Sequence, residues 1–407
     1  MHDFLPSDQA LHEALQQLID AKNAPGTPHG DPVAPLDLPE ALPAHGIGGR
    51  AALAALAGPA LTRPTRVDHP GFFAHMDPPT PWVTWAATQW AAAMNQNLLH
   101  TDSAPAARLL ERRAIEWLAP VFGMDGGHLV PGSSLANLTA LWAARDAAGV
   151  RRVIASEVAH VSVAKAARIL GLPLTTVPVD AAQRMRADLL PDDLSDAAVV
   201  LTAGTTATGA VDPLDAASTA RWRHVDAAWA GPLRLSSHTA VLDGIERADS
   251  VAVSAHKLLY QPKESALVLF ADAAAAHDAL SFGGGYLAVP NIGLQGSHGA
   301  AALPLLATLL AWGRDGLGAR IDADLALAER LAARIAAEPE LELFAPSVTG
   351  VVAWRPRHAD PTAVRERMTD VWVSTTVIGA QTWFRSVAAN PFADPDLVVD
   401  AVLAALG

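Results

Sequence analysis

Short runs of apolar and β-branched residues alternate with longer amphipathic segments through the middle of the chain. Such runs predict buried strands at residues 152–155, 175–179, 198–202, 222–225, 250–253 and 266–270. Segments with helical spacing separate several of them, notably residues 135–147 and 161–170. Apolar strands spaced by helices are typical of a mostly parallel sheet covered on both faces, so the pattern predicts an α/β fold.

The N-terminal part has a different pattern. Helical spacing at residues 11–21 and 50–61 flanks a proline- and glycine-rich stretch, 23–45, that predicts an extended arm. Prolines 70, 78, 79 and 81 exclude a helix from the segment HPGFFAHMDPPTPW, and further helices are predicted at 83–96 and 106–122.

The pattern changes again near residue 313. A long alanine-rich helix is predicted at 317–337, followed by short strands and a closing helix that suggest a smaller α+β domain. These strands are expected at 350–354, 371–374 and 381–387, and the helix at 395–406. We therefore predict an N-terminal arm with helices (1–65), a large domain (66–312) and a small domain (313–407).

Composition narrows the class of protein. The 407 residues are 51% hydrophobic and 17% charged, which favours a large core and excludes wholesale disorder. The net charge of −13 argues against a nucleic-acid partner, which would favour a basic excess. Because the chain has no cysteine, it has no disulfide, thiolate nucleophile, zinc–cysteine site or iron–sulfur cluster. We also predict no metal site.

No segment has the pattern of a membrane span or a signal peptide. The start of the chain has acidic residues and no basic region before an apolar run. The alanine-rich stretch 271–280 is interrupted by charged and polar residues, which disfavours a bilayer. We expect a soluble cytoplasmic protein.

Polar clusters follow several of the predicted strands. In open α/β sheets, ligands bind beyond the carboxyl ends of the strands, so these clusters are candidate site residues. One of them, PGSSLAN at 131–137, puts Ser133 and Ser134 at the start of a helix. It forms either an anion cradle or a plain helix cap. The other clusters contain His160, Thr206 and Asp226.

Lysine is scarce, and one lysine stands out. Of Lys22, Lys165, Lys257 and Lys263, only Lys257 directly follows an apolar strand. Partial desolvation there would lower the lysine pKa and favour Schiff-base chemistry. With Asp226 available to pair with a pyridinium nitrogen, and with an anion cradle, the set suits pyridoxal 5'-phosphate (PLP). Taken alone, Asp226 could be a turn residue and His160 a core histidine.

With these residues in this order, the chain resembles the group II PLP-dependent amino acid decarboxylases, which include the glutamate, aromatic amino acid and 2,4-diaminobutyrate decarboxylases. The resemblance extends from about residue 68 to the C-terminus. It rests on the motifs HPGFF, NQN, SAP…LLER, PGSSLANLTAL, SEVAHVSVAKAARILGL, TAGTTATGAVDPL, HVDAAWAG, ADSVAVSAHK and WFRSVAANP. It implies a fold type I PLP-dependent transferase: a large domain with a mostly parallel seven-stranded sheet and a small C-terminal α+β domain.

The resemblance also implies roles for individual residues. Lys257 would hold PLP as a Schiff base, and Asp226 would pair with the ring nitrogen and keep it protonated. Ala228 would pack on one ring face and the catalytic His160 on the other, with Thr206 near the ring substituents.

The same resemblance implies which residues would contact the phosphate of PLP and the carboxylate of the substrate. Ser133, Ser134 and His256 would bind the phosphate, and Ser297 would add a contact from the partner subunit of a homodimer. The active site would lie at the dimer interface, with the N-terminal arm wrapped around the partner. Arg385 would bind the substrate α-carboxylate.

The substrate side chain is less determined. By position in the resemblance, we expect His75, Asp77, Trp82, His100 and the segment around Tyr286 to line the substrate pocket. Histidines would suit an acidic substrate and Asp77 a basic one. Diaminobutyrate-type, acidic and aromatic substrates all remain open.

The chain departs from the family at the loop that normally carries a catalytic tyrosine. The corresponding stretch, 282–297, is short, and the chain has only two tyrosines, Tyr260 and Tyr286. The proton donor is open among Tyr286, His298, His160 and water.

We predict a PLP-dependent carboxy-lyase that converts an L-amino acid to its amine and carbon dioxide. The alternatives are decarboxylation-coupled oxidative deamination, transamination and a non-catalytic scaffold, the last disfavoured by the presence of the site residues.

Overall fold

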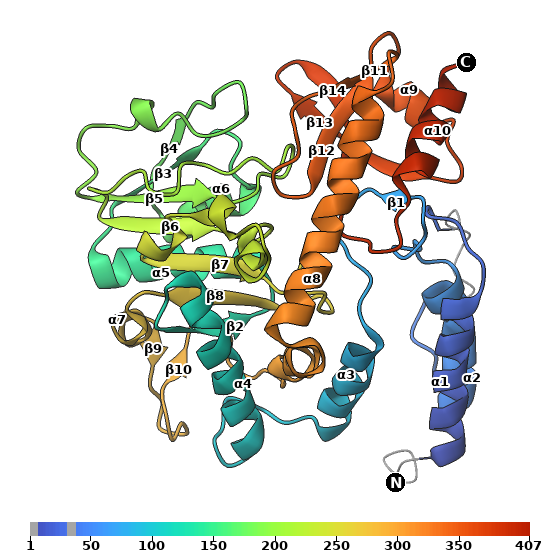
Figure 1. Ribbon diagram of the computed structural model, residues 1–407. Coiled ribbons are helices and arrows are strands. Elements are labelled where there is room, and N and C mark those ends of the chain that lie inside the picture. Colours follow the sequence, from blue (N-terminus) through green and yellow to red (C-terminus); the bar gives the residue numbers. More distant parts are fainter. Residues whose placement is uncertain (1–6, 31–37) are drawn as a thin grey trace.

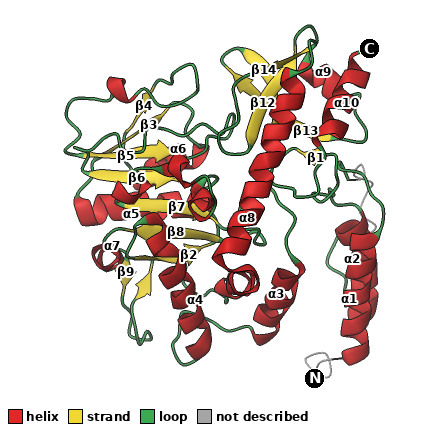
Figure 2. Cartoon of the chain, in the orientation of Figure 1, coloured by secondary structure: helices red, strands yellow, loops and turns green. Residues whose placement is uncertain are grey.

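The computed structural model describes residues 7–30 and 38–407. A large α/β region occupies one side of the molecule and a smaller sheet the other (Figure 1). The hairpin of helices α1 (Asp8–Asn23) and α2 (Gly49–Ala57) stands apart from both (Figures 1 and 2). Part of the predicted arm, 31–37, lies outside the described residues.

The large region is built on a seven-stranded sheet in the order β2-β8-β7-β6-β5-β3-β4. Its strands are β2 (Gly126–Val130), β3 (Arg152–Ser156), β4 (Leu174–Val177), β5 (Ala197–Thr202), β6 (Trp222–Asp226), β7 (Ser250–Ser254) and β8 (Ala266–Phe270). Only β8 runs antiparallel to its neighbours, so the predicted α/β fold with a mostly parallel sheet is confirmed. Sequence analysis missed β2 because GGHLV has only two apolar residues.

Helices cover both faces of this sheet. These helices are α4 (Pro105–Leu118), α5 (Ser133–Ala148), α6 (Val161–Leu170), α7 (Ala273–Ala279) and α8 (Ala302–Ala336), and α3 (Trp82–Met94) packs against α8. Successive strand residues point to opposite faces. Val199 and Leu201 accordingly pack into the core shared with α4 and α8, whereas Ala198 and Val200 pack with α5 and α6. This double cover explains why the strand sequences are continuously apolar.

The C-terminal region contains a five-stranded sheet in the order β1-β13-β14-β12-β11. Its strands are β1 (Phe72–Phe73), β11 (Leu341–Leu343), β12 (Val351–Pro356), β13 (Trp372–Ile378) and β14 (Gln381–Val387), and its short helices are α9 (Pro361–Arg365) and α10 (Pro395–Leu406). The proline-rich segment HPGFFAHMDPPTPW, predicted to be non-helical, thus contains β1, which pairs in parallel with β13. A segment that precedes the large sheet in sequence is therefore built into the small one.

Helix α8 connects the two sheets (Figure 1). It starts earlier than the predicted helix at 317–337 and is interrupted at Gly313, whose backbone (φ 63°, ψ −177°) is not helical. Leu305 and Leu306 before the break pack into the large core, and Leu327 and Leu331 after it pack into the core of the small sheet.

Two shorter features complete the fold. Strands β9 (Ser281–Phe282) and β10 (Asn291–Ile292) form a small antiparallel hairpin, which includes the first part of the short 282–297 segment. Within residues 7–30 and 38–407, no helix combines the length and the apolar character that a bilayer crossing requires.

Candidate active site

A cavity of about 470 Å³ opens where three neighbouring parallel strands end. Thr202, Asp226 and Ser254, which line it, are the last residues of β5, β6 and β7. The first residues of α5 and the residue before α6 close its sides. The cavity brings together most of the sequence-predicted cofactor residues: Ser133, Ser134, His160, Thr206, Asp226, Ala228, His256 and Lys257.

Lys257 lies in the turn that follows β7. Burial lowers the pKa of its amine, and the nearby Asp226 carboxylate opposes this shift only in part. A lowered pKa increases the fraction of neutral amine, the form that attacks a carbonyl carbon. The fold thus gives Lys257 the lowered pKa that favours Schiff-base formation.

The Asp226 carboxylate is only 4% exposed and is held by hydrogen bonds. The Asn137 side chain donates from Nδ2 to Asp226 Oδ2 at 2.8 Å, and the Ala228 amide donates to Oδ1 at 3.2 Å. Asn137 lies on α5, four residues after Ser133, so its side chain emerges on the same helix face. Buried carboxylates require such partners.

A buried chain of hydrogen bonds orients Asn137. Its Oδ1 accepts from His224 Nε2 at 2.9 Å, and His224 Nδ1 lies 2.9 Å from Ser250 Oγ. Ser250 Oγ in turn accepts from Trp222 Nε1 at 2.8 Å. Burial lowers the pKa of His224 to about 4, so the ring is neutral, with its single proton on Nε2 facing Asn137. The amide of Asn137 is therefore fixed with Nδ2 toward Asp226.

The same chain extends to His160. Asn137 Nδ2 also donates to Ser162 Oγ at 2.8 Å, which leaves the Ser162 hydroxyl to donate to His160 Nδ1, 2.8 Å away. The Ser162 amide donates to the same nitrogen at 3.3 Å. Because Nδ1 accepts and burial lowers the pKa of His160, the neutral ring carries its proton on Nε2.

Several donors near α5 suit an anion. The helix begins at Ser133, and no side chain caps its free backbone amides. The hydroxyls of Ser133 and Ser254 contact each other beside them. Thr202 Oγ1 and His256 Nδ1 are buried without a hydrogen-bond partner among the described residues. Burial, aided by Lys263 and Lys257, lowers the pKa of His256 to about 4.

Arg385 lies on β14 of the C-terminal sheet. Its Nη2 donates to the carbonyl of Ala74 at 3.3 Å, and its buried Nε has no partner among the described residues. Burial lowers the pKa of this guanidinium, and the nearby Asp77 carboxylate opposes the shift. His75 is close enough to Arg385 that the guanidinium adds to the lowering of the His75 pKa by burial. A guanidinium with an unpaired donor suits a carboxylate ligand.

Arg385, His75 and Asp77 are not among the residues that line the cavity, and four further predicted residues also lie outside it. Trp82, at the start of α3, is 72% exposed and lines a separate hollow. Tyr286 is 75% exposed and stacks edge-on with His100, with ring centroids 6.4 Å apart. Ser297 Oγ accepts from Asn97 Nδ2 at 3.1 Å. Within one chain, these residues do not meet Lys257 across the cavity.

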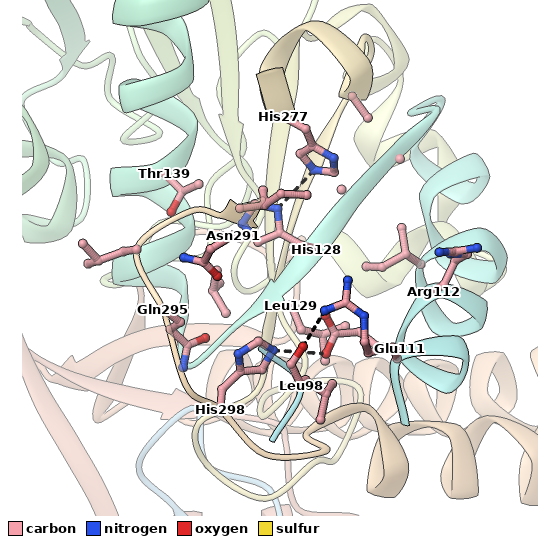
Figure 3. Close-up of a pocket in the computed structure, with 18 of the residues that line it drawn as sticks. Leu98, Glu111, Arg112, His128, Leu129, Thr139, His277, Asn291, Gln295 and His298 are labelled. Atoms are coloured by element: carbon pink, nitrogen blue, oxygen red, sulfur yellow. Dashed lines mark hydrogen bonds and ion pairs between the residues drawn. The ribbon is translucent and has the colours of Figure 1, made fainter. Parts of the chain in front are cut away.

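His298 also lies elsewhere, in a second cavity of about 420 Å³ between α4, β2 and the segment after β10. Figure 3 shows His298 and Glu111 facing each other there; His298 Nε2 is 4.0 Å from Glu111 Oε2. Burial raises the pKa of Glu111 despite the opposing effect of His298. The Leu98 amide donates to the His298 carbonyl at 2.9 Å, so this contact fixes the segment that carries Ser297.

Sequence reasoning missed Asn137, Ser162 and His224. A signal existed for two of them. Asn137 is the last residue of the PGSSLAN motif and a polar residue in an alanine-rich helix. His224 is two residues before Asp226, so both side chains project from the same face of β6.

The sequence of this chain is similar to those of known decarboxylases. The family model described as "Pyridoxal-dependent decarboxylase conserved domain" matches residues 61–357. An L-2,4-diaminobutyrate decarboxylase of Rhizobium meliloti (strain 1021) is 33% identical over 411 residues, covering 90% of this chain and 83% of that protein. Another L-2,4-diaminobutyrate decarboxylase, of Acinetobacter baumannii, is 31% identical over 340 residues, covering 70% and 66%.

The fold also matches solved structures. A structure from Oryza sativa, described as TDC with PLP and tryptamine, superposes with a TM-score of 0.90. The two chains are 23% identical, and the match covers 99% of each. The group II decarboxylase fold predicted from the motifs is therefore confirmed.

Prediction: Asn137→Ala weakens the fold around Asp226. The change removes the partner of Asp226 Oδ2, Ser162 Oγ and His224 Nε2 together. We expect a loss of about 2–4 kcal/mol in the free energy of unfolding, because buried polar groups lose their hydrogen bonds. Urea denaturation measures it. Asn291→Ala, on a side chain with one long bond to Gly293, is the control and should cost little. A loss for Asn137→Ala no larger than the control's would contradict this account.

Proposed function

Because the chain belongs to the pyridoxal-dependent decarboxylase family, we propose that it binds PLP through Lys257 and converts an L-amino acid to the corresponding amine and carbon dioxide. The observation that carries the proposal is a buried lysine with a lowered pKa beside a hydrogen-bonded Asp226, in one cavity with unpaired donors. PLP, when bound, supplies an electron sink for the charge left at Cα as carbon dioxide leaves.

The residues fit PLP at three points. The α5 amides, the Ser133 and Ser134 hydroxyls and the unpaired Nδ1 of His256 would hold the phosphate. Asp226, oriented by Asn137, would keep a proton on the pyridine nitrogen. Ala228 and His160, which both line the cavity, would pack on the two faces of the ring, and Thr206 would lie near the ring substituents.

Arg385 would bind and orient the substrate. A bidentate pair with the α-carboxylate would hold Cα so that the bond to the carboxylate is presented to the cofactor ring. The unpartnered, buried Nε of Arg385 supports this role, because the carboxylate would satisfy it. Met76 and Trp229 in the cavity wall would exclude water from the reacting bond.

We propose His160 as the group that returns a proton to Cα. The hydrogen-bond chain through Ser162 leaves His160 Nε2 protonated, and His160 lines the cavity. Of the two tyrosines in the chain, Tyr260 is buried with its hydroxyl on Asp324, and Tyr286 is largely exposed. Neither tyrosine lines the cavity, so no tyrosine of the same chain is placed to protonate Cα. This absence also favours the second candidate function, a decarboxylation-coupled oxidative deamination or a transamination.

A diamino acid is our first proposed substrate. Asp77 lies close enough to Arg385 and Lys257 to affect the pKa of both. Among the described residues, the hydrogen-bond partner of its carboxylate is Lys263. A second substrate ammonium group would compete with Lys263 for that carboxylate. The two relatives described as L-2,4-diaminobutyrate decarboxylases act, by their names, on such a compound.

We also propose a homodimer whose partner completes the site. The candidate residues outside the cavity, His100, Tyr286 and Ser297, would then face the cavity of the partner subunit. The helices α1 and α2 bury no residue within one chain, and Leu11, Leu15 and Ile19 leave an apolar row on α1 exposed. Burying such a row against a second copy would offset its cost of exposure.

Prediction: the protein is a dimer that depends on α1. Leu11→Asp with Leu15→Asp places two carboxylates in the apolar row and should shift the protein toward monomer with at least a tenfold loss of activity. Light scattering after gel filtration measures the mass. Gln17→Asp, an exposed position on the same helix, should stay dimeric. Full activity in a monomeric species would contradict the shared site.

Prediction: the purified protein is yellow, absorbing near ~420 nm, and borohydride fixes the cofactor on Lys257. Lys257→Ala should lose the reducible linkage, because Lys257 is the one lysine among the described residues that line the cavity. Peptide mapping by mass spectrometry locates the reduced cofactor. A label on the peptide of Lys263 or Lys165 would show that the assignment is wrong.

Prediction: Arg385→Lys lowers turnover but keeps the cofactor. The change retains a charge and loses the bidentate pair, which should cost about 2–4 kcal/mol, or roughly thirtyfold to a thousandfold in kcat/KM. The band near ~420 nm should persist. Steady-state kinetics and absorbance measure both. Release of the cofactor would indicate a structural or phosphate-binding role, and unchanged kinetics a role outside the site.

A further inference from the structure

The turn that carries Lys257 is strained at Tyr260. The Tyr260 amide donates to the Lys257 carbonyl at 2.8 Å, and the Gln261 amide donates to the Ala255 carbonyl at 3.1 Å. Tyr260 has a φ of +57°, in the left-handed region that bulky side chains rarely adopt. Such a conformation persists only where surrounding contacts enforce it.

The enforcing contact is a buried hydrogen bond to α8. The Tyr260 hydroxyl donates to Asp324 Oδ2 at 2.6 Å, and both side chains are buried. The Tyr260 ring also packs edge-on against Trp312, with centroids 5.7 Å apart. The Tyr260 hydroxyl is the only hydrogen-bond partner of the Asp324 carboxylate among the described residues, since Asp324 Oδ1 has none.

The next residue adds a second bond to the same helix. Gln261 Nε2 donates to Thr308 Oγ1 at 3.0 Å and to the Leu259 carbonyl at 2.7 Å. Thr308 precedes the break in α8 at Gly313, and Asp324 follows it. Two consecutive residues of the lysine turn therefore hold both segments of a broken helix.

The second segment of α8 continues into the small-sheet core. Leu327 and Leu331 pack in one cluster with Phe384, the residue before Arg385. A shift of this segment relative to the lysine turn would move the small sheet, and Arg385 with it, relative to Lys257. Neither Tyr260 nor Asp324 lines the candidate active-site cavity.

We propose that Tyr260 and Asp324 are positioning residues: their hydrogen bond clamps the Lys257 turn to α8 and so sets the Lys257 amine relative to the Arg385 guanidinium. The proposal rests on the proposed roles of Lys257 and Arg385. It concerns geometry alone, because neither residue would touch the cofactor or the substrate.

Three variants separate the clamp from general packing. Tyr260→Phe keeps the ring against Trp312 and removes only the hydroxyl. Asp324→Asn keeps an acceptor for that hydroxyl and removes the charge. Asp322→Asn is the matched control: it makes the same change two residues away, on a carboxylate that accepts from Ser237.

Each variant is measured in two ways. Hydrogen–deuterium exchange of the amides at 257–261 is followed in the cofactor-free protein, and kcat and KM are measured per bound cofactor in the loaded protein. For Tyr260→Phe we expect at least fivefold faster exchange and at least a fivefold lower kcat, with a larger change in kcat than in KM. Asp324→Asn should stay within threefold of the parent, and Asp322→Asn within twofold.

A smaller effect of Tyr260→Phe on either exchange or kcat would overturn the proposal, as would an Asp324→Asn variant as impaired as Tyr260→Phe. Should Tyr260→Phe fail to fold, Asp324→Ala, which removes the acceptor of the Tyr260 hydroxyl, is measured against the same thresholds and decides in its place. If the parent protein loads no PLP or releases no carbon dioxide, the proposed function fails, while the exchange measurement still tests the clamp.

Discussion

The candidate site depends on one constraint, the burial of the Asp226 carboxylate. A carboxylate in the interior needs donors to offset its desolvation, and Asn137 supplies one only when its amide is correctly turned. His224 fixes that orientation through its hydrogen bond to Asn137 Oδ1. The same amide also donates to Ser162, whose hydroxyl bonds to His160. A single asparagine therefore sets the state of both polar groups that would contact a cofactor ring. These hydrogen bonds together leave one consistent assignment of donors and acceptors from His224 to His160.

The rest of the fold fixes how the residues on the large sheet are placed relative to Arg385 on the small sheet. The large sheet presents Lys257 and Asp226 at its carboxyl edge, whereas Arg385 lies on the other sheet. Helix α8 spans both cores, and Trp229 of the cavity wall donates from Nε1 to the Thr349 carbonyl of the C-terminal region at 2.7 Å. Strand β1 joins the small sheet from a segment that precedes the large one. Relative placement of the amine and the guanidinium is thus a property of the whole chain.

Much of this was predictable from the sequence. Strands that are buried on both faces are continuously apolar, so the strands at 198–202 and 266–270 were predicted from the sequence. Ordered motifs predicted Lys257, Asp226 and His160 as site residues, and all three line one cavity. Strand β2 escaped because its glycines carry no hydrophobic signal, and β1 because its two residues are paired only by tertiary contact with β13. Asn137 and His224 act through partners distant in sequence, and Trp82 and Tyr286 were assigned by position although they are exposed within one chain. Spacing alone does not determine such contacts.

The most direct test of the central claim is the reaction stoichiometry. The PLP-loaded protein is incubated with single L-amino acids, beginning with 2,4-diaminobutyrate and including acidic and aromatic ones, and carbon dioxide, amine, keto acid or aldehyde, and hydrogen peroxide are quantified together. The account predicts one carbon dioxide and one amine for each amino acid consumed, with no peroxide. Peroxide and aldehyde in equal amounts, or keto acid without carbon dioxide, would contradict it and assign the site to oxidative deamination or transamination.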